Sequence, residues 1–221
     1  MYFEQAKPVW GKGLQREMNI TCGFYAAVCR PSEKAVLRIA VSGFYRVFVN
    51  NRFVYYGPVR TAHGFYRVDE IPLTKWLTES NNHVAVETVN YYVNSYYSLK
   101  QPGFIQMEIS ADGKIVAATK EKAVGFFAFR LLHRVRKMQR YSFQRAFGES
   151  YRLTPDTDSW RLGRFSAAQP LELEESAEKS LLPRELPLQS YPDCFPDYVL
   201  ERGEVSLTEL PKNPLRDRSL T

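Results

Sequence analysis

The sequence predicts an all-β fold, with the strands arranged as an antiparallel β-sandwich or jelly roll. Three observations lead to this prediction. Apolar and polar residues alternate with period two over most of residues 21–145, turn-forming residues separate the alternating runs, and neither a βαβ alternation nor an internal repeat is present. Hydrophobic residues make up 44% of the 221-residue chain, which is enough to fill the core of one good-sized domain.

The expected strands are separated by recognisable turns. Asn50-Asn51 tolerates the positive φ of a tight hairpin turn, and Ala111-Asp112-Gly113 is a second hairpin signal. One short helical turn is expected at residues 73–77, with Thr74 as its cap. The strands themselves are expected at residues 37–41, 45–49, 53–56, 83–93, 104–110, 114–119, 126–132 and 138–143.

A change in composition near residue 170 predicts a domain boundary. Residues 171–221 contain 6 Lys/Arg against 11 Asp/Glu and 6 of the 13 prolines, whereas residues 1–170 carry the positive charge. Proline disfavours both helix and central strand. We therefore expect a β-sandwich domain at 1–170 and an extended connector at 171–221. Two stretches of the connector alternate like strands, residues 171–174 and residues 204–210, and the second is consistent with the start of a following β-domain.

The basic stretch at residues 120–145 has two interpretations. It holds eight Lys/Arg against Glu121 alone, interleaved with aromatic residues, and the whole chain has a net charge of +6. This composition is found in nucleic-acid platforms, where phosphates bind the charges and bases stack on the rings. The alternative is a strand pair with aromatic side chains in the core and arginines in solvent or in ion pairs. Alternation favours the strand pair, so we expect no nucleic-acid partner.

The sequence contains no familiar catalytic motif: it lacks a G-x-S-x-G elbow, a P-loop, an H-E-x-x-H helix and a glycine-rich dinucleotide turn. Two strand carboxylates, Glu87 and Glu108, could act as acid and base in glycoside hydrolysis if they faced each other. An isolated strand glutamate is more often exposed or paired with an arginine. We therefore expect no catalytic residue in this chain.

No metal or cofactor site is expected either. The histidines are dispersed, the cysteines lack metal-ligand spacing, and three turn aspartates form no ligand series. We interpret all three histidines as structural. The residues concerned are His63, His83, His133, Cys22, Cys29, Cys194, Asp112, Asp156 and Asp158.

Targeting signals are also missing from the sequence. The N-terminus lacks a basic segment followed by an apolar one, and the longest apolar runs are far shorter than the ~18–20 residues of a membrane span. Three cysteines are too few to crosslink a chain of this size. We therefore expect a cytoplasmic protein without a membrane partner.

Several motifs occur in order between residues 35 and 103. They are the segments at residues 42–50, 56–62, 64–71, 82–87 and 90–104, and segments at 139–151 and 182–187 follow. In this order and spacing the chain resembles the N-terminal β-sandwich region of bacterial α-L-rhamnosidases, glycoside hydrolase family 78. The resemblance covers most of residues 6–187. It implies a galactose-binding-domain-like jelly roll.

The resemblance also implies which part of the enzyme this chain would lack. Enzymes of that family carry their catalytic acids on an (α/α)6 barrel that follows the sandwiches, and this sequence has no such series of helices. The implied role is a non-catalytic module, inactive by itself, whose partner is the C-terminal catalytic domain of a larger hydrolase.

One group of residues has the side chains that sugars require. Aromatic rings pack against the C–H faces of sugars, and planar polar groups bind adjacent hydroxyls. The candidate carbohydrate-binding residues are Arg60, His63, Tyr66, Tyr91, Tyr92, Asn94, Tyr96, Tyr97 and Gln101.

Two roles remain open for this tyrosine-rich stretch. Tyrosine-rich surfaces also form domain interfaces, and we favour packing against the catalytic domain. In that case the isolated chain is expected to self-associate through residues 91–104, because an apolar patch is left uncovered. The alternative is a free-standing carbohydrate-binding module for a rhamnose-containing glycan.

Overall fold

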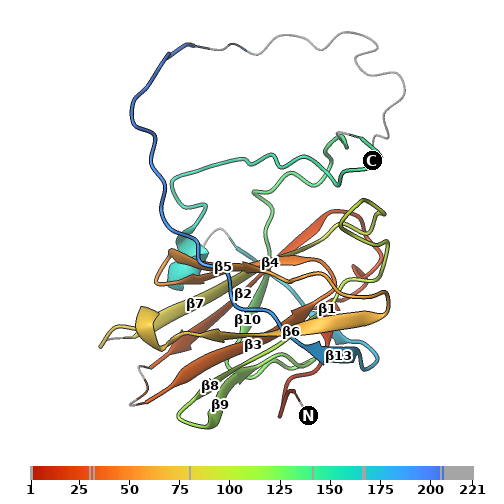
Figure 1. Cartoon of the computed structure of the whole chain (residues 1–221), viewed down its shortest axis with the longest axis vertical. Helices are drawn as coiled ribbons and strands as arrows, with labels where there is room; N and C mark the ends of the chain where they lie inside the picture. Colours follow the sequence, from red (N-terminus) through yellow and green to blue (C-terminus); the bar gives the residue numbers. More distant parts are fainter. Residues whose placement is uncertain are drawn as a thin grey trace.

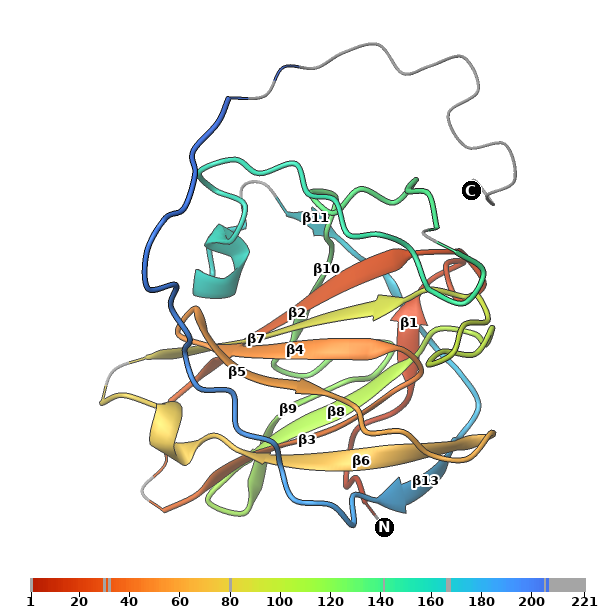
Figure 2. The ribbon, with the colours of Figure 1, turned by 45° about the horizontal axis from the view of Figure 1, so that its top comes forward.

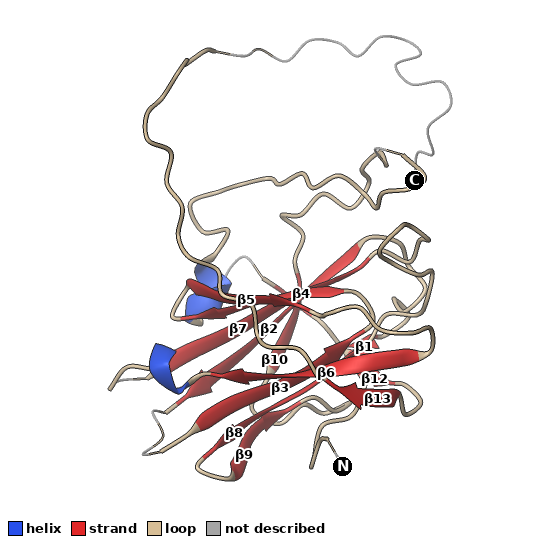
Figure 3. Cartoon of the chain, in the orientation of Figure 1, coloured by secondary structure: helices blue, strands red, loops and turns tan. Residues whose placement is uncertain are grey.

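Two β-sheets face each other in the computed structural model and form a β-sandwich (Figures 1 and 3). The predicted all-β fold is confirmed. The structure describes residues 2–29, 31, 33–79, 81–140, 142–165, 168–204 and 206. The strands are β1 (Val9–Gly11), β2 (Ile20–Val28), β3 (Ala35–Val41), β4 (Phe44–Val49), β5 (Arg52–Gly57), β6 (Phe65–Pro72), β7 (Asn82–Asn90), β8 (Ile105–Ala111), β9 (Lys114–Ala118), β10 (Phe127–Arg130), β11 (Gln169–Pro170), β12 (Leu173–Glu175) and β13 (Ser180–Pro183).

The strand order is that of a jelly roll. One sheet has the order β12-β1-β8-β3-β6-β13, with β9 paired to β8, and the other has the order β11-β10-β2-β7-β4-β5. Successive strands cross from sheet to sheet, as in β2, β3 and β4 or in β6, β7 and β8. All pairs are antiparallel except that of β13 with β6, which is parallel.

The core lies between the two sheets and follows the period-two pattern. Side chains at alternate positions point inward, and burial of one such large apolar side chain stabilises the fold by about 1.5–3 kcal/mol. β2 was not predicted as a separate strand, because eight of its nine residues are buried and both of its faces are therefore mainly apolar. Fully buried core residues include Phe24, Val47 and Val86 from one sheet and Leu37, Ile39 and Met107 from the other.

Both predicted hairpin turns are confirmed. Asn50 and Asn51 have φ angles of 52° and 64°, and Asp112 and Gly113 have φ angles of 49° and 76°. These left-handed conformations match the right-handed twist of the flanking strands, and asparagine and glycine adopt them at low cost.

Two local predictions are wrong. The helical turn exists as a 3₁₀ helix (Thr74–Trp76), but the Thr74 hydroxyl does not cap it and instead accepts the backbone N–H of Ala35 at 2.9 Å. No strand is present in the described part of residues 138–143, where only Arg140 forms an isolated bridge, with Phe147. The Arg140 side chain there donates to the backbone carbonyls of Arg145, Asn94 and Phe143.

A long irregular segment, residues 131–165, covers the outer face of the second sheet (Figure 2). It contains a second 3₁₀ helix, Ser159–Leu162, whose Trp160 is buried against β2. A Cβ atom at Gly23 would lie 2.9 Å from the Trp160 ring, so the ring packs directly on the strand backbone. Sequence periodicity does not reveal this layer, because the described residues of the segment form no strand and only one short 3₁₀ helix.

The segment after residue 168 returns to the sandwich in three short strands. β11 pairs with β10, β12 pairs with β1, and β13 pairs with β6. The strand-like residues 171–174 overlap β12, whereas β13 was not expected. The domain boundary near residue 170 stays a prediction. Of residues 204–210, the expected start of a β-domain, all but 204 and 206 lie outside the described residues.

Candidate functional site

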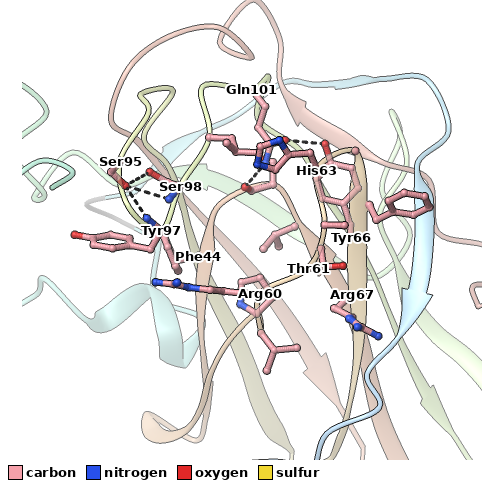
Figure 4. A pocket seen from close by; sticks show the side chains of 18 of the residues that line it. Phe44, Arg60, Thr61, His63, Tyr66, Arg67, Ser95, Tyr97, Ser98 and Gln101 are labelled. Atoms are coloured by element: carbon pink, nitrogen blue, oxygen red, sulfur yellow. Dashed lines mark hydrogen bonds between the residues drawn. The ribbon is translucent and has the colours of Figure 1, made fainter. Parts of the chain in front are cut away.

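A pocket of about 240 Å³ lies at one end of the sandwich, between the loop that follows β5 and the loop that follows β7 (Figure 4). It is lined by residues 41, 42 and 44, by residues 58–67, and by residues 95–99 and 101. Loops at the ends of a sandwich are where binding sites are expected on this architecture.

The turn that carries Phe44 depends on a close approach of two backbones. A Cβ atom at Gly43 would lie 1.9 Å from the carbonyl oxygen of Val89, so glycine is required for the turn between β3 and β4 to touch β7. This turn places Phe44 in the pocket wall, where its ring packs edge-on against the ring of Tyr97 with centroids 6.0 Å apart. Both rings are half-buried.

One side of the pocket is held by a chain of hydrogen bonds. The Tyr66 hydroxyl donates to the side-chain oxygen of Gln101 at 3.0 Å, and the Gln101 amide nitrogen donates to the carbonyl of Ser42 at 2.9 Å (Figure 4). The Tyr66 ring meets Phe104 edge-on at 4.6 Å. Burial raises the pKa of Tyr66, so its hydroxyl stays protonated and remains a donor at neutral pH.

The opposite loop is ordered by its own short-range contacts. The Ser95 and Ser98 hydroxyls are 2.7 Å apart, and the backbone N–H of Ser95 donates to the Ser98 carbonyl at 2.9 Å. The backbone N–H of Tyr96 also donates to the carbonyl of Gln144 at 3.0 Å. A loop held in this way loses little conformational entropy when a ligand binds.

The charges of the pocket are all of one sign. Its lining contains Arg60, His63 and Arg67, and among its described residues there is no aspartate or glutamate. Arg67 points out of the pocket and donates to Glu185 at 2.9 Å and to the Pro183 carbonyl at 2.6 Å. Arg60 and His63 are exposed, and within the described chain the Arg60 side chain has no hydrogen bond or ion pair.

The structure brings together six of the nine predicted carbohydrate-binding residues. They are Arg60, His63, Tyr66, Tyr96, Tyr97 and Gln101. The sequence interpretation missed Phe44, Thr61, Phe65, Ser95 and Ser98, which also line the pocket. The Ser42-Gly43-Phe44 turn was a usable signal for Phe44, because a glycine between two strands indicates a tight turn.

The other three predicted residues lie outside this pocket. Tyr91 is only 8% exposed and accepts a hydrogen bond from Arg134 at 3.1 Å, because strand alternation directs it to the outer sheet face beneath residues 131–165. Tyr92 adopts a φ of 51° and contacts Lys100. Asn94 uses its side-chain oxygen to accept the backbone N–H of Lys100 at 2.8 Å.

The surface expected for self-association is consequently small. Tyr91 and Phe104 are buried by this chain itself, and the large exposed apolar side chains left between residues 91 and 104 are Tyr96 and Leu99. Self-association stays a prediction, but it would have to rely on these two side chains.

The two candidate carboxylates do not form a catalytic pair. Glu87 is buried on the outer face of one sheet, with Arg46 at 2.6 Å and Arg161 at 3.6 Å. Glu108 is buried on the outer face of the other sheet, where its carboxylate accepts backbone N–H groups of residues 4–6 at 3.0–3.1 Å. A sugar bond cannot lie between them, because the whole sandwich separates the two side chains.

Two of the three histidines, His83 and His133, have structural contacts. The Nδ1 atom of His83 is 2.8 Å from the Tyr25 hydroxyl, and His133 stacks on Tyr151 with ring centroids 6.2 Å apart. Burial lowers the pKa of His133. In the described part of the chain no group of three or more His, Cys, Asp or Glu side chains is arranged to hold a metal ion.

Three arginines of the basic stretch make ion pairs or hydrogen bonds within the protein. Arg134 contacts Glu149 at 2.9 Å, Arg136 binds Glu17, and Arg140 donates to the Asn94 carbonyl at 2.8 Å. Of the aromatic residues in this stretch, Phe126 and Phe129 are buried, whereas Phe127 and Phe143 are exposed.

Among the residues that the structure describes, no helix is long and apolar enough to cross a membrane.

The fold and the pocket together define a class of protein: a jelly-roll β-sandwich with a pocket between loops at one end and no pair of carboxylates across that pocket.

No protein-family model and no curated protein matches the chain. Solved structures do. The family 78 rhamnosidase of Bacillus sp. GL1 superimposes with a TM-score of 0.69 and 26% identity, over 84% of this chain and 20% of that chain.

Two further α-L-rhamnosidases share the fold. The α-L-rhamnosidase of Dictyoglomus thermophilum matches with a TM-score of 0.57 and 17% identity, over 83% of this chain and 22% of that chain. The α-L-rhamnosidase of Aspergillus terreus matches with a TM-score of 0.56 and 15% identity, over 80% of this chain and 22% of that chain. The chain thus spans about a fifth of the rhamnosidases that it matches. The resemblance to family 78 is confirmed, and the partial coverage fits an N-terminal domain of such enzymes.

Proposed function

We propose that this chain is a non-catalytic β-sandwich module of an α-L-rhamnosidase-like glycoside hydrolase, and that its loop-end pocket contacts carbohydrate. The observation that carries the proposal is the pocket itself. It combines half-buried aromatic rings, Phe44 and Tyr97, with the polar groups of Arg60, His63 and Gln101 on an ordered frame. Saccharide sites are built from these two kinds of group.

The placement of the two candidate carboxylates supports the non-catalytic part of the proposal. Inverting glycosidases hold their two carboxyl groups about 6.5–9.5 Å apart across the scissile bond, and retaining ones about 5–5.5 Å apart. Glu87 and Glu108 lie on outward faces of different sheets, and protein groups already occupy their oxygens. Their role is to attach the covering segment and the N-terminal segment to the sandwich.

A second surface supports packing against the catalytic part of such an enzyme. Beyond Tyr191, which still contacts the sandwich through Phe53 and Tyr55, the chain extends away from the sheets (Figure 1). Four large apolar residues there are 73–89% exposed: Phe195, Tyr198, Val199 and Leu200. Exposed apolar side chains in a row mark a protein interface.

The test is an NMR titration of the ¹⁵N-labelled chain with L-rhamnose and a rhamnose-containing disaccharide. Even a dissociation constant of about 1 mM, or ~4 kcal/mol, gives measurable shifts. We expect saturable shifts confined to residues 58–67 and 95–101, lost in Tyr97→Ala and retained in the control Tyr198→Ala. Titrations without saturable shifts would contradict carbohydrate contact.

The catalytic half of the proposal is tested with aryl rhamnosides. The purified chain is expected to give no turnover above the buffer rate, because no acid and base flank its pocket. Turnover that disappears in Glu87→Gln or Glu108→Gln would overturn the non-catalytic assignment.

A further inference from the structure

The charged side chains that line the loop-end pocket are donors only: Arg60 and Arg67 line it, and no aspartate or glutamate does. The Gln101 side-chain oxygen already accepts the Tyr66 hydroxyl, and the Ser95 and Ser98 hydroxyls are bonded to each other. The Arg60 guanidinium brings five N–H donors and no acceptor. A neutral sugar offers hydroxyls that need acceptors as well as donors, and this lining contains no carboxylate to supply them.

The cationic side chains of the pocket differ in what they are free to bind. Arg67 is neutralised by Glu185 at 2.9 Å, at the edge where β13 joins β6. Arg60 has no anionic partner within the described chain, and its side chain extends from its loop toward the part of the pocket lined by Phe44 and Tyr97 (Figure 4). The planar fork of a guanidinium matches the two oxygens of a carboxylate.

We propose that the pocket recognises an acidic saccharide, with Arg60 binding the carboxylate of a uronic acid unit. The sugar ring then lies against the Phe44 and Tyr97 rings, whose faces suit its C–H groups. The inference rests on the proposed assignment of this pocket to carbohydrate and adds the chemical class of the ligand. An acidic protein segment would present the same carboxylate, but the two aromatic rings beside the arginine favour a ligand with the C–H faces of a sugar ring.

The experiment compares two ligands with the same sugar units, one with free carboxylates and one with neutral methyl esters. Trigalacturonic acid and its trimethyl ester are titrated into the full chain by calorimetry at 20 mM and 150 mM salt. We expect the acid to bind about tenfold more tightly than the ester at low salt, as for a charge-assisted bidentate contact. Arg60→Gln should abolish this difference.

The matched control is Arg152→Gln, which removes an equal charge from an exposed arginine that does not line this pocket. It should retain the tenfold preference. Equal losses in Arg60→Gln and Arg152→Gln would show non-specific attraction by net charge and overturn the inference. The NMR spectrum of each variant checks that it is folded.

The remaining outcomes separate this inference from the proposed function. If L-rhamnose or the ester binds at the pocket as tightly as the acid, carbohydrate contact stands and the acidic specificity is wrong. If neither acid nor neutral sugars bind, both fail. Hexaglutamate peptide is titrated as well. If it binds as tightly as trigalacturonic acid and this binding is lost in Arg60→Gln, the pocket is a site for an acidic protein segment, and the saccharide class is wrong.

Discussion

At the scale of single residues, His133 shows how burial sets the charge of a side chain. It lies half-buried within the covering segment and stacks on Tyr151, and burial lowers its pKa below the usual value of about 6.5. The folded protein therefore holds this imidazole neutral at a pH where the unfolded chain already protonates it.

This difference predicts a loss of stability on acidification. As the pH falls below about 6.5, the unfolded state takes up the proton first, so the free energy of unfolding decreases until the folded-state pKa is passed. His133→Gln removes the titrating group and should flatten this part of the curve, whereas exposed His63→Gln should not. Urea unfolding at pH 5, 6 and 7 measures both. An unchanged slope in His133→Gln would show that the ring does not contribute.

At the scale of elements, one ion pair attaches the segment after β13 to the sandwich. Arg184 donates to Asp69 of β6 at 2.7 Å, and their side chains are 8% and 0% exposed. The Tyr45 hydroxyl of β4 donates to the same carboxylate. Burial, and then the negative charge of Asp69, raise the pKa of Tyr45 well above its usual value, so this hydroxyl remains a donor.

Removing one member of this buried pair should be costly. Arg184→Met leaves the Asp69 charge buried without its cation, and we expect the free energy of unfolding to fall by about 3–5 kcal/mol. Glu185→Gln breaks only the exposed pair with Arg67 and should cost about 0–1 kcal/mol. Urea denaturation gives both values. A loss below about 1 kcal/mol in Arg184→Met would mean that water replaces the arginine.

At the scale of the whole molecule, the net charge of +6 invites non-specific binding to nucleic acid. Arginines of the basic stretch nevertheless connect the covering segment to the rest of the chain: Arg134 contacts Glu87 and Arg136 contacts Glu17. Arg134 also pairs with Glu149 within the segment. We expect binding to a 30-mer RNA or DNA that is weak, independent of sequence and lost at physiological salt. Fluorescence anisotropy at 20–200 mM salt tests this. Submicromolar, salt-resistant binding to one RNA would contradict it.

The sequence alone predicted many of the strands and the hairpin turns, because these features depend on residues that are neighbours in the chain. Alternation predicts the strands because one face of each must leave water, and Asn50-Asn51 and Asp112-Gly113 predict their turns because few other residues adopt positive φ. The candidate loop residues were also predictable in part, since tyrosines, an arginine and a glutamine gather in two loops that meet at one sandwich end.

Contacts between distant segments decided the rest. Tyr91 and Tyr97 are six residues apart in similar sequence, yet residues 131–165 bury the first and leave the second in the pocket. The sequence favoured an exposed or arginine-paired Glu87 over a catalytic one, but only the structure identifies the arginines around it, which are 41 to 74 positions away. Periodicity reports only which face of a strand is apolar. Which segment covers that face, and which charges it brings, depends on the packing of the whole chain.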